Sequence, residues 1–326
     1  MFLKKEQTRE LHIPHKDYDP IDFDTYVGQA ALKKRVTLRL NSLSRGESFK
    51  ALFFAAFGQG KTSLARIIAR EMFKRNLIDH YYETVAGRFE TKTDVDRFLH
   101  DIKPYSLIFI DEIHGLAGTA RDALYPAIQD NVYSYQDGSS MVKLPPGLSW
   151  VGATTELGRV HPALQRRLMP MSLEPSTVFE RAVIAGLQRM TVDGDAAVEM
   201  ANRCWSPWEV KDEIYLTSED IAKSYNAEKI TRQYVIDACD VLGIDTNSLR
   251  PHERRILETL YKNPKFLRRG KVFAMAKGPL ISISGVDAET FVSSCEPKLL
   301  RLGYITVSSI GRELTPKAFE SYFAEK

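Results

Sequence analysis

The sequence predicts an α/β fold: a helix-flanked parallel sheet, then a helical region, then a small module that ends in a β-hairpin. Three short apolar runs, "KALFFAA", "YSLIFIDE" and "LSWVGATT", are typical of central strands because each is continuous and bounded by polar or glycine-rich text. Helix-like stretches such as "KTSLARIIAREMFKR" separate the runs, as crossovers between parallel strands require.

The chain divides into four predicted segments. Residues 1–20 are polar and are expected to form an arm, and residues 21–172 hold the sheet, whose end Pro170 and Pro175 punctuate. Residues 173–246 read as helices only. Residues 247–326 contain two helical stretches and then "YITVSS" and "GRELT", a pattern that predicts a winged-helix module.

The charge of the chain is unevenly spread. Residues 247–326 carry 14 Lys and Arg against 8 Asp and Glu, in a chain whose net charge is +3. This basic end indicates a module that binds a polyanion, for which double-stranded DNA is the expected partner, although a solvated basic surface is an open alternative. The residues expected to contact DNA phosphates are Arg268, Arg269, Lys271 and Arg312.

Other global features favour a cytoplasmic protein. The three cysteines follow no metal or disulfide spacing, which fits a reducing compartment. The start "MFLKKEQTRELH" is no signal peptide, and no apolar run approaches the ~20 residues that a membrane span needs.

The stretch "LFFAAFGQGKTSLARIIA" resembles a phosphate-binding loop with one deviation. The usual pattern is Gly, four residues, then Gly-Lys-Ser/Thr, and here Ala55 takes the first position. Gly58 and Gly60 supply backbone freedom, Lys61 is placed to reach the β- and γ-phosphates, and Thr62 to ligate magnesium. Ala55 is tolerated if its backbone needs no positive φ.

A second motif, "LIFIDE", strengthens the prediction of an ATP site with Mg²⁺. Asp111 is expected to hold the magnesium ion, and Glu112 to act as general base toward the attacking water. In "VGATT", Thr155 is the candidate for sensing the γ-phosphate, with Thr154 close behind.

The segment "HPALQRRLMP" places two arginines at a predicted helix end. Arg166 or Arg167 is a candidate arginine finger that reaches the nucleotide of a neighbouring subunit. A solvated basic pair is the alternative.

The order of these motifs resembles the RuvB family, hexameric AAA+ motors that drive Holliday-junction branch migration with RuvA. The resemblance spans residues 19–322 and rests on "YVGQAALKKRV", "GQGKTSLARIIAREM", "LIFIDEIHGLAG", "ALYPAIQD", "LPPGLSWVGATTELG" and "EPKLLRLGYI". It implies an AAA+ P-loop ATPase domain, a helical lid and a winged-helix DNA-binding domain.

The resemblance also implies roles for single residues. Tyr26 and Val27 are expected at the adenine, and Arg167 becomes the preferred finger. The segment "NVYSYQDGSSMVKLPP" matches the hairpin that grips RuvA, in a shortened form. The residues expected around the nucleotide are Tyr26, Val27, Gly58, Gln59, Gly60, Lys61, Thr62 and Ser63.

Three departures mark a divergent relative, such as a phage or mobile element encodes. The family's Gly-Pro-Pro-Gly loop is "AAFG" here, and the wing keeps only Arg312 of Arg-Gly-Arg. In the lid, Trp208 stands where the family has an arginine for the γ-phosphate, and Lys211, about one helical turn on, is a candidate to compensate.

The predicted function is an ATP-dependent DNA motor that drives Holliday-junction branch migration as a ring oligomer, expected to be a hexamer. The alternative is an ATP-switched DNA scaffold or loader with slow hydrolysis, which Ala55 and Trp208 favour and the Asp111–Glu112 pair opposes. A sequence-specific winged-helix regulator is a third hypothesis.

Overall fold

The computed structural model describes residues 11–14, 19–135, 141–267 and 270–324. These residues form two compact units: the first comprises the described residues of 1–55 and 59–175, and the second those of 56–58 and 176–326. The predicted arm, residues 1–20, lies mostly outside the described residues.

The first unit is built on a five-stranded parallel sheet with the strand order β2-β3-β6-β1-β7, which confirms the predicted α/β class. Its strands are β1 (Lys50–Phe54), β2 (His80–Val85), β3 (Ser106–Asp111), β6 (Ser149–Thr154) and β7 (Met169–Ser172). Because the strands are parallel and in register, the ends of β1, β3 and β6 meet at one edge of the sheet.

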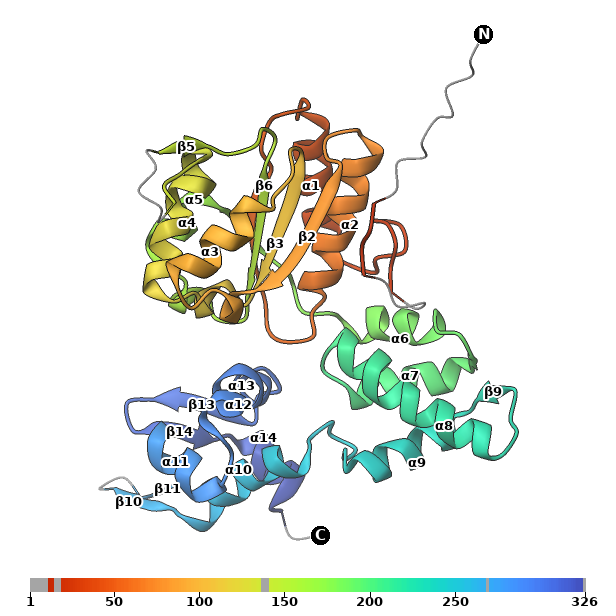
Figure 1. Ribbon diagram of the computed structural model, residues 1–326. Helices are drawn as coiled ribbons and strands as arrows, with labels where there is room; N and C mark the ends of the chain where they lie inside the picture. Colours follow the sequence, from red (N-terminus) through yellow and green to blue (C-terminus); the bar gives the residue numbers. More distant parts are fainter. Residues whose placement is uncertain (1–10, 15–18, 136–140, 268–269, 325–326) are drawn as a thin grey trace. The chain divides into compact units, whose positions relative to one another are not determined.

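Helices cover both faces of this sheet (Figure 1). Side chains alternate between the two faces along each strand. Phe53 and Phe109 face the core shared with α1 and α2, whereas Leu52 and Ile108 face the core shared with α3, α4 and α5. The helices are α1 (Ala30–Asn41), α2 (Lys61–Lys74), α3 (Lys92–His100), α4 (Gly118–Asp130) and α5 (Pro162–Arg167).

Two strands at the sheet edges were not predicted. Strand β2, "HYYETV", is mostly half-buried, so it lacks the continuous apolar run of a central strand. Strand β7 contains Pro170, which the sequence pattern treats as punctuation. A proline is tolerated there because β7 pairs on one side only, with β1.

A short hairpin follows α4. Strands β4 (Val132–Tyr133) and β5 (Val142–Lys143) pair antiparallel, and residues 136–140 between them lie outside the described residues. This is the segment that the sequence resemblance matches to a RuvA-gripping hairpin, and that match stays a prediction.

The second unit begins with a helical region that has its own core, centred on Met200, Ile214 and Val235. The prediction that this region contains helices only is wrong in one detail, because β8 (Thr191–Val192) and β9 (Lys229–Ile230) form a small parallel pair. Its helices are α6 (Val178–Gly186), α7 (Gly194–Arg203), a π-helix (Glu209–Tyr215), α8 (Leu216–Ser224) and α9 (Arg232–Leu242).

The C-terminal module of this unit packs helices against a three-stranded sheet of order β12-β14-β13. The closing hairpin predicted from the sequence is confirmed, since β13 (Ile305–Ser308) and β14 (Gly311–Leu314) pair antiparallel. The other elements are α10 (Pro251–Lys262), β10 (Lys265–Leu267), β11 (Gly270–Val272), β12 (Ala274–Met275), α11 (Lys277–Ser284), α12 (Ala288–Thr290), a π-helix (Phe291–Cys295), α13 (Glu296–Arg301) and α14 (Pro316–Tyr322).

Candidate active site

The loop between β1 and α2 has the backbone geometry of a phosphate cradle. Gly58 and Gly60 adopt φ of +74° and +88°, and α2 begins directly after Gly60. Ala55 lies outside the positive-φ region, which confirms that the missing glycine causes no strain there. A side chain at position 60 would also meet the hydroxyl of Tyr26 at 2.7 Å, so Gly60 is required by space as well as by φ.

Lys61 lies buried at the start of α2, with 7% of its surface exposed. Its Nζ donates a hydrogen bond to the carbonyl oxygen of Ala55 at 2.9 Å, so the ammonium is turned into its own loop. Burial lowers the pKa of Lys61, and the nearby carboxylates of Glu112 and Asp111 partly offset this effect. A phosphate bound in the loop would therefore interact with an ammonium group that is already largely desolvated.

The two predicted magnesium ligands lie together although they are far apart in sequence. Thr62 Oγ1 donates to Asp111 Oδ2 at 3.0 Å, from the first turn of α2 to the end of β3. A hydroxyl and a carboxylate are oxygen ligands of the kind that Mg²⁺ takes, usually alongside water and nucleotide phosphates. The donor set therefore fits the implied ion.

Glu112 has a strained backbone and a well-fixed side chain. Its φ is +47°, uncommon for a residue other than glycine and typical of functional positions. Its Oε2 accepts from both the backbone N–H and the hydroxyl of Thr155, each at 3.2 Å. The carboxylate is 43% exposed, so it keeps access to solvent.

His114 is the residue of this site that sequence reasoning missed. Its Nδ1 lies 3.2 Å from Glu112 Oε2 and 2.9 Å from Thr154 Oγ1, and its Nε2 lies 3.8 Å from Glu156. The motif "FIDEIH" contains it, but a histidine two residues after a strand-end acid gives no signal until the fold places Thr154 beside it.

The two residues that the resemblance places at the adenine lie next to the loop. Tyr26 is buried, and its hydroxyl donates to the carbonyl oxygen of Gly60 at 3.2 Å. Val27 is half-buried. The contact ties the start of the domain to the phosphate loop, while the adenine role of both residues stays a prediction.

The candidate finger arginines differ in their surroundings. Arg166 is exposed. Arg167 donates from Nη1 to the carbonyl oxygen of Ala163 at 2.8 Å, and its guanidinium carbon lies 4.9 Å from the ring centroid of Tyr125. Because a finger acts on a neighbouring subunit, its role stays a prediction.

The predicted DNA contacts are only partly described. Arg268 and Arg269 lie outside the described residues, and Lys271 lies on β11. Arg312 is paired with Glu296 at 2.5 Å, so its charge is already balanced within the module. All four remain predicted contacts.

The lid position of Trp208 lies immediately before the π-helix Glu209–Tyr215. The suggestion that Lys211 compensates for the absent arginine assumed α-helical spacing, and the i→i+5 bonding of a π-helix changes that spacing. Lys211 is therefore a weaker candidate than the sequence indicated.

Within the described part of the chain, no helix is both long enough and apolar enough to cross a bilayer.

Comparisons with known proteins find the RuvB family in both sequence and structure. Residues 18–172 match the model of the Holliday junction DNA helicase RuvB P-loop domain, and residues 247–322 match that of the RuvB C-terminal winged helix domain. The RuvB subunit of the Holliday junction branch migration complex of Kosmotoga olearia is 30% identical, over 92% of this chain and 88% of the relative. That of Fusobacterium nucleatum is 27% identical, over 97% of this chain and 96% of the relative. Among solved structures, the RuvB Holliday junction branch migration motor of Thermotoga maritima matches with a TM-score of 0.80 and 27% identity, covering 95% of this chain and 99% of that one.

Proposed function

Because the chain belongs to the RuvB family, we propose that it is an ATP-driven motor that migrates Holliday junctions, working as a ring of identical subunits. The observation that carries the proposal is the set of Lys61, Thr62, Asp111 and Glu112 at one edge of the sheet. The chain keeps this hydrolytic set while it departs from the family pattern elsewhere.

The residues divide the chemistry of ATP hydrolysis among them. The loop N–H groups and Lys61 bind the phosphates, and Thr62 and Asp111 would hold Mg²⁺. When bound, the ion supplies charge neutralisation on the phosphate oxygens. Glu112 accepts the proton of the water that attacks the γ-phosphorus, while the bond to the leaving ADP oxygen breaks. Arg167 of a neighbouring subunit is the proposed finger.

His114→Ala tests whether Glu112 must be held in place. We expect kcat for ATP hydrolysis to fall roughly tenfold with little change in KM, because the His114 imidazole lies 3.2 Å from the Glu112 carboxylate and its removal leaves that carboxylate free to move. A tenfold fall in rate corresponds to about 1.4 kcal/mol. His100→Ala is the matched control, since His100 has a side chain that is 81% exposed. Steady-state ATPase assays give both values, and equal kcat for the two variants would contradict the role of His114.

The direct test of the proposed function uses a synthetic four-way junction with homologous arms. With ATP the protein should convert it to duplex products, and with a non-hydrolysable analogue it should not. The same assays run with and without a RuvA-type partner show whether the short hairpin of β4 and β5 still serves such a partner.

The alternative, an ATP-switched scaffold, predicts a different result in the same junction and ATPase assays. It would bind the junction in the presence of nucleotide and turn ATP over negligibly, whether or not DNA is present. Electron microscopy with an ATP analogue and DNA distinguishes a closed ring from an open spiral or filament.

A further inference from the structure

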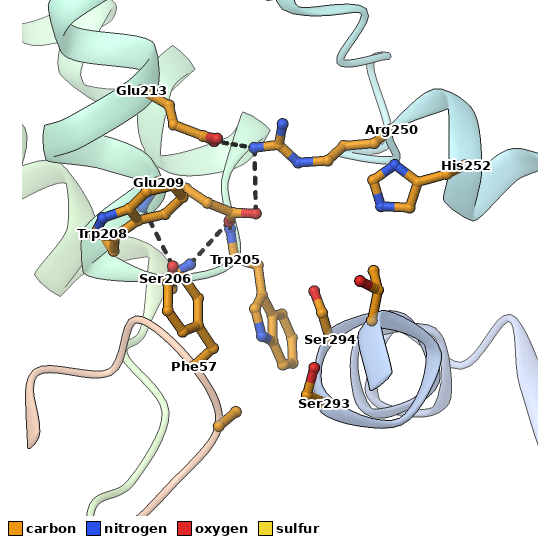
Figure 2. Close-up of a pocket in the computed structure, with 12 residues that line it drawn as sticks. Phe57, Trp205, Ser206, Trp208, Glu209, Glu213, Arg250, His252, Ser293 and Ser294 are labelled. Atoms are coloured by element: carbon orange, nitrogen blue, oxygen red, sulfur yellow. Dashed lines mark hydrogen bonds and ion pairs between the residues drawn. The ribbon is translucent and has the colours of Figure 1, made fainter. Parts of the chain in front are cut away.

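A cavity of about 220 Å³ lies within the second unit, where the tip of the phosphate loop meets the lid and the C-terminal module (Figure 2). Phe57 and Trp208 contribute aromatic rings to its wall, and Arg250 and His252 contribute cationic or titratable groups. Residues 56–58 of the loop group with this unit rather than with the sheet domain.

At the loop end of the cavity, two departures from the family pattern contact each other. The ring centroids of Phe57 and Trp208 are 5.2 Å apart in an edge-on arrangement. The backbone N–H of Trp208 donates to the carbonyl oxygen of Gly58 at 3.3 Å. A Cβ on Gly58 would lie 2.5 Å from Ser206 Oγ, so the loop tip is packed tightly against "WSPW".

Glu209 is the next residue along, and its two carboxylate oxygens have different partners. Its Oε2 accepts the backbone N–H groups of Trp205 and, at 3.1 Å, Ser206, while Ser206 Oγ accepts the N–H of Glu209 at 3.3 Å. Its Oε1 lies 3.6 Å from Arg250 and 3.8 Å from Lys298. One side chain thus fixes the turn that touches the loop and also holds two cations (Figure 2 shows the pairing with Arg250).

Both cations belong to the DNA-binding end of the chain. Arg250 precedes α10 and is also paired with Glu213, and Lys298 on α13 is 2% exposed and bonds Glu253 at 2.9 Å. Burial disfavours the charge of Arg250, but the attraction of Glu213 and Glu209 outweighs it and raises the pKa of Arg250. Arg250 therefore stays charged, although burial raises the pKa of its partner Glu213 above the ordinary value.

We infer that Glu209 is a positioning residue that couples the phosphate loop to the DNA-binding module. Displacement of α10 or α13 on DNA binding moves Arg250 and Lys298, and Glu209 passes the change to Ser206, Trp208 and so to the loop tip. This inference rests on the proposed function, because it assumes that nucleotide and DNA are both ligands. In this chain, the Glu209 carboxylate and the Phe57–Trp208 pair would link the lid to the loop. In the family pattern, an arginine stands at the position of Trp208.

The test compares Glu209→Gln with Glu213→Gln. Both remove one carboxylate from Arg250, and in each variant Arg250 keeps its other acidic partner. Only Glu209 bonds Trp205 and Ser206, and a glutamine there keeps an amide oxygen for those N–H groups while losing the charge. Lys298 keeps Glu253 in either case.

Two quantities are measured for each variant and for the wild type. One is the stimulation of ATP turnover by a four-way junction, resolved into kcat and KM. The other is the change in Kd for an ATP analogue caused by saturating junction DNA, which does not depend on hydrolysis. We expect Glu209→Gln to reduce both couplings at least about fivefold, with basal turnover without DNA within about twofold of wild type. Glu213→Gln should keep the couplings.

If the two variants lose the couplings equally, or if neither loses them, the role of Glu209 is overturned. Equal losses would mean that the couplings depend only on the ion pairs of Arg250, which both variants weaken. Thermal unfolding midpoints are compared alongside to identify a general loss of fold. A wild-type protein that couples nucleotide to DNA but fails to migrate junctions would refute the proposed motor and leave the coupling role of Glu209 intact.

Discussion

Lys61→Met is expected to abolish ATP-driven junction migration and to weaken ATP binding about 10- to 100-fold. The ammonium is the charged donor at the start of α2, and a hydrogen bond from a charged group contributes about 1.5–3 kcal/mol to binding. Isothermal titration with ATP gives the affinity, and the four-way junction assay gives the activity. Methionine keeps the aliphatic length of the side chain, so the packing of α2 is preserved.

The same substitution is expected to stabilise the protein without nucleotide. Burial lowers the pKa of Lys61, so its charged form destabilises the folded state at every pH below that lowered pKa. This loss of folding stability decreases only as pH rises toward the pKa that the lysine has in the unfolded chain. At neutral pH the loss is fully present, and methionine removes it. Tm in the absence of ATP should therefore rise.

Lys50→Met is the matched control for the loss of ATP binding. Lys50 begins β1, and its Nζ donates to the carbonyl oxygen of Gln129 at 3.1 Å. Burial lowers its pKa as well, with partial compensation from Asp130. This variant should keep ATP binding, and a loss of binding equal to that of Lys61→Met would mean that the phosphate loop is not the site.

The central strands and the phosphate loop could be predicted because their signals are local. A buried parallel strand must be apolar throughout, and a phosphate loop needs glycines, a lysine and a hydroxyl in consecutive positions. The two motifs predict Thr62 and Asp111 as ligands of the same magnesium ion, and the structure brings the two side chains to 3.0 Å.

The edge strands carried no such signal. Strand β2 is half-buried and β7 includes Pro170, so neither shows an apolar run or a clean alternation. These segments become strands because they pair with a neighbouring strand, and the periodicity of the sequence gives no information about that pairing.

The contacts that make the site specific were also beyond the sequence. His114 becomes informative only because β6 places Thr154 beside it, and Trp208 only because Phe57 lies against it. From the sequence alone, Trp208 indicates only the loss of an arginine. In the structure it contacts Phe57, and this contact holds the lid turn against the loop tip.

Glu112→Gln is expected to lower kcat for ATP hydrolysis at least about 100-fold while leaving the ATP Kd within about twofold. A positioned general base contributes about 10²- to 10⁴-fold, and an amide cannot take the proton of the attacking water. Glutamine has nearly the same shape, and its oxygen can still accept from the N–H and hydroxyl of Thr155. The variant should therefore bind ATP and DNA and fail to migrate junctions.

Glu156→Gln is the control for this substitution. Glu156 lies close by, 3.8 Å from His114 Nε2 and 2.8 Å from Arg159, but it does not share the hydrogen bonds of Glu112. Its loss should leave kcat within about threefold of wild type, because it is placed to orient a neighbour of the base rather than to act on water. Single-turnover assays with excess enzyme separate the chemical step from product release.

The size of the Glu112→Gln effect also decides between the motor and the scaffold. A motor couples movement along DNA to ATP hydrolysis, so removal of the base must stop migration and hydrolysis together. A scaffold needs only the bound state, and the variant would then assemble on junctions as wild type does and show little change in an already slow turnover. A 100-fold fall in kcat with junction binding retained would support the motor, because it would show that the wild-type geometry of Glu112, Thr155 and His114 is set for hydrolysis and not merely for holding ATP.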